Sequence, residues 1–79
     1  MLQVIKEVIT KWDPIGLMEF APYDEYYGEC LIILNELTLK QETLGRIIYR
    51  VFKNNFGEVF QADLKKCIEI ATEIESQTN

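Results

Sequence analysis

Apolar residues recur at intervals of three and four along much of this chain, and this spacing places them on one face of an α-helix. The pattern is clearest over residues 2–11, 39–54 and 61–76, where polar and charged residues occupy the opposite face. A chain of 79 residues buries only about 60–65% of the surface that its unfolded form exposes, so almost every large apolar residue must serve the core. The spacing therefore predicts helices packed on one another in a single all-α domain spanning residues 1–79.

A further helical segment, which ends near residue 37, is apolar over most of its circumference. Its apolar side chains are Tyr26, Tyr27, Cys30, Leu31, Ile33, Leu34 and Leu37. A helix of this kind is typical of the centre of a bundle. The run over residues 30–34 also matches a buried strand, but the chain offers no second convincing strand to pair with it. We therefore expect a compact bundle of four main helices, and the start of this one is left open because Gly28 weakens a helix.

The connection between the second and third helices is predicted from a capping box. Thr38 can cap the free N–H groups at a helix start, and Gln41, three residues later, can bond back to it. Residues 35–37 would then form the connection, and the next helix would run over residues 39–54. The predicted inner stripe of that helix comprises Leu44, Ile47, Ile48, Val51 and Phe52.

Single residues predict further details of the second half of the chain. Gly45 lies inside the third helix, where we expect another helix to approach closely. Gly57, or one of the asparagines before it, is expected to adopt the left-handed conformation that closes many helices. Residues 76–79 are expected to form a frayed tail. The fourth helix carries an apolar stripe of Leu64, Cys67, Ile68, Ala71 and Ile74.

The stretch W-D-P-I-G-L, residues 12–17, predicts a capped turn and loop after the first helix. Asp13 can cap free backbone N–H groups, and Pro14 suits the first helical position, where its missing N–H costs nothing. Trp12 and Leu17 then occupy the two positions of a hydrophobic staple. Gly16 limits the result to about one turn. The stretch is therefore interpreted first as structural, although a functional role is left open.

The net charge argues against nucleic acid as a partner. The chain carries 8 Lys and Arg against 13 Asp and Glu, a net charge of −5, whereas general nucleic-acid binding needs a basic surface. The longest unbroken apolar run, residues 30–34, is far shorter than the roughly 18–20 residues that span a bilayer, and no signal-peptide pattern is present. We expect a cytoplasmic protein that binds neither nucleic acid nor membrane.

The residues that most enzymes use are scarce. There is no histidine, which excludes histidine general bases, histidine-activated nucleophiles and imidazole metal sites. Cys30 and Cys67 are surrounded by aliphatic residues, so they are interpreted as reduced core residues, although a disulfide is the alternative. Asp24, Glu25 and Glu29 could together hold Mg²⁺ or Ca²⁺, but a solvated helix start is the favoured interpretation. We expect no enzyme activity and no cofactor.

Acidic and aromatic residues concentrate in the first half of the chain. Residues 12–37 hold six acidic residues and no base, whereas residues 38–57 hold four bases. The favoured interpretation is that the two segments pack together and neutralise each other; the alternative is an acidic face for a basic partner. Aromatic residues beside carboxylates also favour a protein-binding face, or else they complete the edge of a small core. The candidate partner surface is Met18, Glu19, Phe20, Tyr23, Asp24, Glu25, Tyr26 and Glu29.

The W-D-P-I-G-L motif, followed by D-E-Y at residues 24–26 and a helical run, resembles the YugE-like family of small Bacillus-type bacterial proteins, a domain of unknown function. The resemblance covers essentially the whole chain, and W-D-P-I-G is its most specific part. It implies a compact all-helical fold without an assigned activity or catalytic residues. The family commonly has Asp-Pro after D-E-Y, whereas this chain has Tyr27 and Gly28 there.

Three functions are consistent with these observations. The leading hypothesis is a non-enzymatic protein-binding module that uses the acidic and aromatic surface around residues 12–29. The second is an acidic inhibitor or immunity-type protein that masks a basic enzyme or toxin with Asp24, Glu25, Glu29 and Glu36. The third is a small carboxylate-based metal-binding protein or enzyme. The sequence indicates neither the protein partner nor the oligomeric state.

Overall fold

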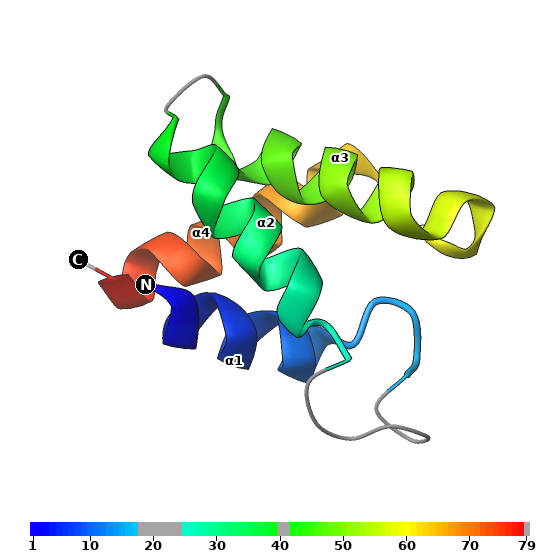
Figure 1. Ribbon diagram of the computed structural model, residues 1–79, viewed down its shortest axis with the longest axis horizontal. Helices are drawn as coiled ribbons and strands as arrows, with labels where there is room; N and C mark the ends of the chain where they lie inside the picture. Colours follow the sequence, from blue (N-terminus) through cyan, green and yellow to red (C-terminus); the bar gives the residue numbers. More distant parts are fainter. Residues whose placement is uncertain (18–24, 40–41, 79) are drawn as a thin grey trace.

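The computed structural model describes residues 1–17, 25–39 and 42–78. In this part of the chain the structure is built from α-helices and has no strand, which confirms the predicted all-α class (Figure 1). The helices are α1 (Leu2–Trp12), α2 (Tyr27–Thr38), α3 (Leu44–Phe56) and α4 (Leu64–Thr78), with a short 3₁₀ helix η1 (Gly57–Val59) after α3.

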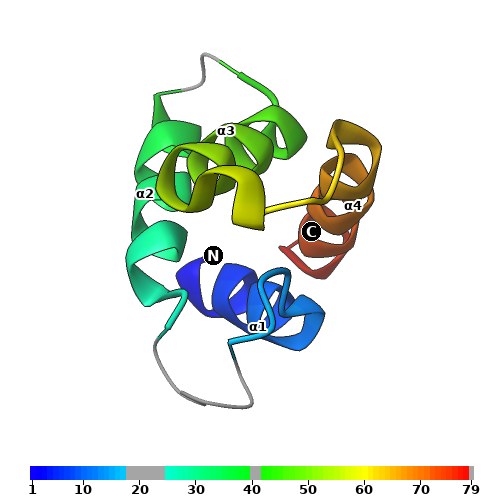
Figure 2. The ribbon, with the colours of Figure 1, turned by 90° about the vertical axis from the view of Figure 1, so that its right-hand side faces the viewer.

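The four helices form a closed ring around one core. α3 packs against α2 and α4, and α1 packs against the same two helices. Figure 2 shows α1 and α3 on opposite sides of the molecule, with α2 and α4 between them. The buried apolar side chains come from all four helices and from the segments before α2 and α4, namely Ile5, Val8, Ile9, Tyr26, Cys30, Ile33, Leu44, Ile47, Ile48, Val51, Phe52, Phe60, Cys67, Ile70, Ala71 and Ile74.

The predicted inner stripe of α3 is confirmed, because all five of its residues are buried. In α4 the stripe differs from the prediction at two positions, and one of them is Leu64, which is only half-buried. Ile68 is exposed at about half of its surface, and Ile70 is buried instead. The backbone and Cγ1 of Ile68 lie close to Gly45 where α4 meets α3, while about half of the residue remains exposed.

The predicted central position of α2 is wrong. α2 packs against α1 and α3 through the side that carries Cys30 and Ile33. Tyr27, Leu31 and Ile32 remain 40%, 42% and 44% exposed. A helix that is apolar all round needs neighbours all round to bury its surface. Here the ring gives α2 neighbours on one side, so the other side faces outward.

The predicted connection between α2 and α3 is also wrong, because residues 35–37 continue α2 to Thr38. The hydroxyl of Thr38 donates to the carbonyl of Asn35 at 2.6 Å, so it bonds back into α2 and does not cap the next helix. Gln41, the other half of the predicted capping box, lies outside the described residues. α3 begins later than predicted, at Leu44, after Thr43 in an extended conformation.

Both ends of α4 differ from the prediction. α4 begins at Leu64, and the carboxylate of Asp63 accepts the N–H of Lys66 at 2.9 Å, a helix cap that the sequence analysis missed. Ser76 and Thr78, which were expected in a frayed tail, belong to α4. Their hydroxyls donate to backbone carbonyls three residues earlier, which satisfies these groups within the last turn.

Of the two glycine predictions, the one for Gly45 is confirmed. Gly57 follows the last residue of α3 with a φ of 58° and a ψ of −131°, so it ends the helix with a positive φ but outside the left-handed helical conformation that was predicted. Gly45 lies where α4 approaches closely: a Cβ placed on Gly45 would be 2.8 Å from Cγ1 and 3.0 Å from Cα of Ile68. A Cβ placed on Gly28 would meet no atom within 4 Å. Gly45 is therefore needed for packing inside the domain, whereas Gly28 is not.

Gly45→Ala is expected to lower the free energy of unfolding by about 1–3 kcal/mol, because the added methyl group forces α3 and α4 apart. Gly28→Ala is the matched control, since the same methyl group has open space there. It is expected to leave stability unchanged or to raise it by up to about 1 kcal/mol through helix propensity. Urea unfolding of both variants measures the difference; equal effects would contradict the close approach of α4.

Candidate functional site

The turn after α1 is organised by Asp13. Its backbone is left-handed, with φ 51° and ψ 60°, and its N–H donates to the carbonyl of Ile9 at 2.8 Å, which ends α1. Its carbonyl accepts the N–H of Gly16 at 3.1 Å, and its side-chain Oδ1 accepts the N–H of Leu17 at 2.9 Å. The predicted capping by Asp13 is thus present, but no helix follows within residues 14–17. Asp13 ends one helix and holds a turn.

Tyr26 fastens this turn to the start of α2. Its hydroxyl donates to Oδ1 of Asp13 at 2.6 Å and accepts the N–H of Ile15 at 3.1 Å. The residue is only 1% exposed, so its predicted place on a partner surface is wrong. Its ring packs edge-on against Phe52 and Phe56, with centroids 5.9 and 6.5 Å away. A tyrosine can be buried in this way because its hydroxyl has partners.

Trp12 belongs to the same aromatic cluster. Its ring lies edge-on to Phe52 and Phe60, at centroid distances of 6.1 and 6.0 Å, and those two rings stack on each other at 5.4 Å. These contacts join the end of α1 to α3 and to the segment before α4. The predicted staple between Trp12 and Leu17 stays a prediction, although both residues are half-buried against the core. The W-D-P-I-G-L motif therefore has a structural role.

Five of the eight residues of the predicted partner surface lie outside the described residues, namely Met18, Glu19, Phe20, Tyr23 and Asp24. Glu25 is exposed. Glu29 is half-buried, and its Oε2 accepts a hydrogen bond from Nδ2 of Asn55 on α3 at 2.9 Å. Of the three described members, Glu25 alone is exposed in the way that the prediction requires.

An ion pair between Arg50 and Glu36 joins the basic and acidic segments where α2 meets α3. Arg50 on α3 donates to Glu36 on α2 and to Glu42 before α3, with N–O distances of 2.5 Å each. The hydrogen bonds to Glu42 and Glu36 raise the pKa of Arg50. This ion-pair network supports the favoured interpretation of the charge pattern.

Both cysteines are buried and free, as the favoured interpretation predicted. Burial, together with the charge of Glu29, raises the pKa of Cys30 to about 12. Burial and the charge of Asp63 raise the pKa of Cys67 to about 11. A thiol reacts as its thiolate, so both side chains are unreactive at neutral pH and act as small core residues.

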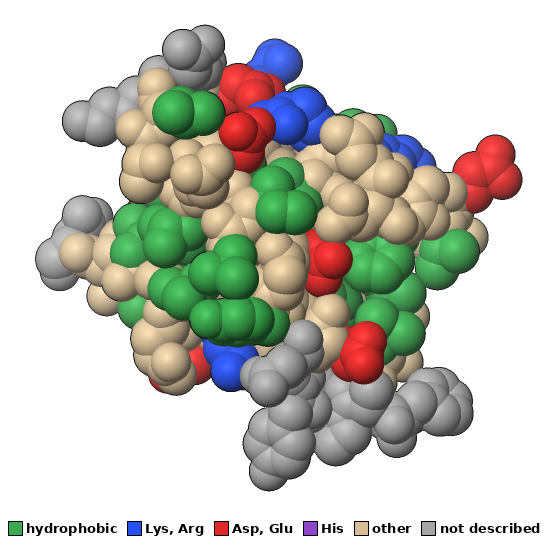
Figure 3. Space-filling model, in the orientation of Figure 1, with side chains coloured by type: hydrophobic (Ala, Val, Ile, Leu, Met, Phe, Trp, Pro, Cys, Tyr) green, Lys and Arg blue, Asp and Glu red, His purple; other side chains and the backbone are tan. Residues whose placement is uncertain are grey.

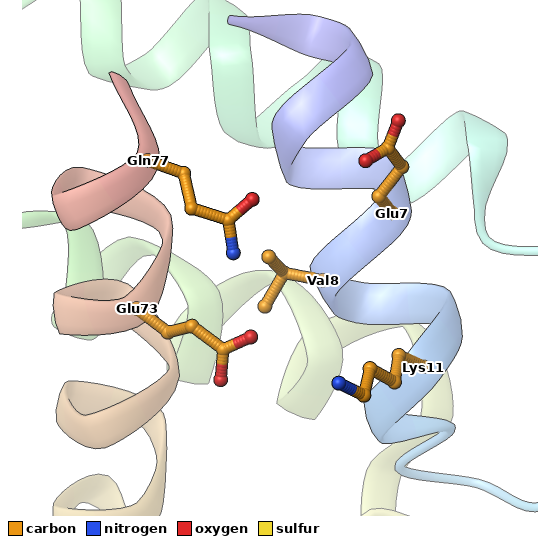
Figure 4. A pocket seen from close by; sticks show the side chains of 5 residues that line it. All are labelled: Glu7, Val8, Lys11, Glu73 and Gln77. Atoms are coloured by element: carbon orange, nitrogen blue, oxygen red, sulfur yellow. The ribbon is translucent and has the colours of Figure 1, made fainter. Parts of the chain in front are cut away.

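Three hollows on the described surface are smaller than a typical ligand site. Figure 4 shows one between α1 and α4, where Lys11 faces Glu73 and Gln77 across Val8. It encloses about 170 Å³. A second hollow beside it encloses about 200 Å³, and a third, between α3 and α4, encloses about 270 Å³. Pockets that hold small molecules usually enclose about 300–1,000 Å³. These hollows do not favour a small-molecule substrate.

Among the described residues, no group of three or more Asp, Glu, Cys or His side chains is arranged to hold a metal ion. Among the described helices, none has both the length and the apolar composition that crossing a bilayer requires.

A feature that the sequence analysis missed is the outward side of α2. We call it the outer face of α2 and define it by its exposed residues Tyr27, Gly28, Leu31, Ile32, Asn35, Thr38 and Leu39. None of them is charged, although the chain has a net charge of −5. Figure 3 shows hydrophobic side chains gathered over α2, with acidic side chains toward α3. Lys6 on α1 lies 5.5 Å from the ring centroid of Tyr27 and borders this face.

Comparison of the chain with models of known protein families, with curated proteins and with solved structures found no match. The resemblance to the YugE-like family stays a prediction that rests on the W-D-P-I-G motif and on the D-E-Y cluster.

Tyr26→Phe is expected to lower the free energy of unfolding by about 1–2 kcal/mol at neutral pH, because Asp13 and Ile15 each lose a hydrogen-bond partner. The effect depends on pH. Burial, and then the hydrogen bond to Asp13, raise the pKa of Tyr26 from 10.0 to about 12. The unfolded chain therefore ionises first, and the advantage of the wild type is full below pH 10 and is lost as pH rises toward 12.

Urea unfolding of wild type and Tyr26→Phe from neutral to alkaline pH measures this advantage. The ionisation of Cys30 and Cys67 also destabilises the fold at high pH, but it affects both proteins equally and cancels in the difference. An advantage that stays constant through the alkaline range would show that the Tyr26 hydroxyl lacks the buried partners described here.

Proposed function

We propose that this chain is a non-enzymatic protein-binding module that docks a helix of its partner on the outer face of α2. The observation that carries the proposal is the exposure of Tyr27, Leu31 and Ile32 on one side of a helix whose exposed residues bear no charge. The proposal keeps the predicted function class but moves the docking surface from residues 12–29 to α2.

The composition of the outer face matches the centre of a protein interface. Such centres are depleted in charged residues and enriched in aromatic ones, and tyrosine is a frequent anchor. Contiguous apolar surface on a small domain also marks interaction sites more often than chance exposure does. α2 therefore combines an anchor, Tyr27, with two aliphatic side chains, Leu31 and Ile32, on one exposed side.

The contacts of the carboxylates support the choice of this function over the acidic inhibitor. An inhibitor that imitates phosphates needs carboxylates that are available to a basic partner. Among the described carboxylates of that hypothesis, Glu36 is already paired with Arg50 and Glu29 accepts a hydrogen bond from Asn55, which leaves Glu25 as the exposed one. The outer face of α2, by contrast, carries no charge, because Glu29 and Glu36 lie beside it and are not among its exposed residues.

We further propose that the protein works in the cytoplasm. The support is the pair of free thiols, Cys30 and Cys67, because unpaired cysteines are typical of a reducing compartment.

A photo-cross-linking benzophenone amino acid placed at Leu31 tests the docking surface in source cells. The matched control carries the same amino acid at Val59, which is 62% exposed on η1, away from α2. We expect a protein adduct from position 31 and none from position 59, and we expect Ile32→Lys to remove the adduct because it places a charge in the docking surface. The melting temperature of each variant checks that the fold is retained.

Mass spectrometry then identifies the adduct. Identical adducts from both positions, or no adduct from position 31, would contradict the proposal. An adduct that survives Ile32→Lys in a folded protein would also contradict it.

A further inference from the structure

Gly28 is a recess on the outer face of α2 that the fold itself does not require. It is exposed, and a Cβ placed on it would meet no atom within 4 Å. Glycine in a helix costs up to about 1 kcal/mol relative to alanine. Nothing in the described part of the domain occupies the space that a Cβ at this position would fill. A recess of this kind lets the side chain and backbone of another helix come close.

Ile32 lies one helical turn after Gly28 on the same outward side. The two residues are four apart, which is about 6 Å along the helix axis. Ile32 is 44% exposed, so the outer face carries a projecting side chain beside a recess. When two such faces meet with their helices antiparallel, the recess of each lies opposite the projection of the other. The outer face is thus complementary to itself.

The domain already contains the same pairing. At the contact of α3 with α4, Ile68 lies directly over Gly45, closer than any Cβ would permit. There a glycine on one helix accepts an isoleucine from the next helix. α2 presents both halves of this contact, Gly28 and Ile32, on its exposed side.

We propose that the helix that docks on the outer face of α2 is α2 of a second copy of this chain. The two helices run antiparallel about a two-fold axis, and Ile32 of each copy packs over Gly28 of the other. The inference rests on the proposed function, because it uses the same face, and it names the partner.

Charge permits this pairing in an acidic protein. Two chains of net charge −5 repel each other at long range, but the outer face brings no charged residue to the centre of the contact. Two acidic residues at its border have partners within the domain, since Glu36 pairs with Arg50 and Oε2 of Glu29 accepts a hydrogen bond from Asn55. A cationic partner would gain little electrostatic attraction from a face without charge. A second uncharged face has no charge to remove from water there.

The size of the contact indicates a weak and reversible dimer. α2 has 12 residues and is therefore about 18 Å long. One helix face of this length lies at the small end of specific interfaces, where association is transient. The dimer is therefore expected to form at high protein concentration and to dissociate on dilution.

Sedimentation velocity of the full chain over a range of concentrations tests the proposal. We expect a concentration-dependent dimer in the wild type. Gly28→Ala should weaken dimerisation by about tenfold or more, because each added methyl group fills a recess that Ile32 occupies. The same substitution should leave the stability of the dilute monomer unchanged or raised, so weaker dimerisation would not reflect a damaged fold.

Further variants test whether the dimer forms through the outer face of α2. Ile32→Lys should remain monomeric at every concentration, whereas Val59→Lys, the control on η1, should dimerise like the wild type. In an Ile32→Ala background, Gly28→Ala should cost much less than it does in the wild type, because the shorter side chain leaves room for the methyl group.

Several outcomes would overturn the inference. They are a wild type that stays monomeric at every concentration, a dimer that Gly28→Ala leaves unchanged, and equal effects of Gly28→Ala in the two backgrounds. A monomeric wild type whose position 31 cross-links to a different protein would overturn the second copy as partner and leave the proposed function standing. Absence of both the dimer and the cross-link would overturn both proposals.

Discussion

The hydrogen bond between the Tyr26 hydroxyl and the Asp13 carboxylate is the constraint on which the first half of the structure depends. It joins the end of α1 to the start of α2, two points that are 13 residues apart in the chain. Because the ring of Tyr26 lies in the aromatic cluster with Phe52, the same side chain also fixes both helices against α3. One residue thus sets the positions of three helices, and the turn at residues 13–17 is held by its polar end.

Periodicity predicted most of this fold because it reports which side of a helix is apolar. It predicted α1 and the inner stripe of α3, whose polar and apolar sides are clearly separated. It failed at the helix ends, since Thr38 bonds backward within α2 while Asp63 bonds forward into α4. Local sequence permits either direction for a short hydroxyl or carboxylate side chain, and the tertiary contacts select one.

The candidate site was harder to predict, and the reason is physical. A tyrosine is equally suited to an interface and to a core, and the choice for Tyr26 depended on a hydroxyl partner that lies far away in the chain. For α2 the composition indicated only that most of its surface is apolar. Whether such a surface is buried depends on the number of neighbouring helices, which the pattern of a single helix does not contain. The outer face of α2 therefore became visible only in the folded ring.

The two buried thiols have a consequence for measuring the motions of this domain. Cys30 lies on α2 and Cys67 lies on α4, and both are fully enclosed by the core. A thiol reagent can reach either cysteine only when the helix that carries it opens. The rate at which each cysteine is modified therefore reports how often that helix opens. Since α2 and α4 occupy separate sides of the ring, the two native cysteines report on the opening of two different helices, and no label needs to be introduced.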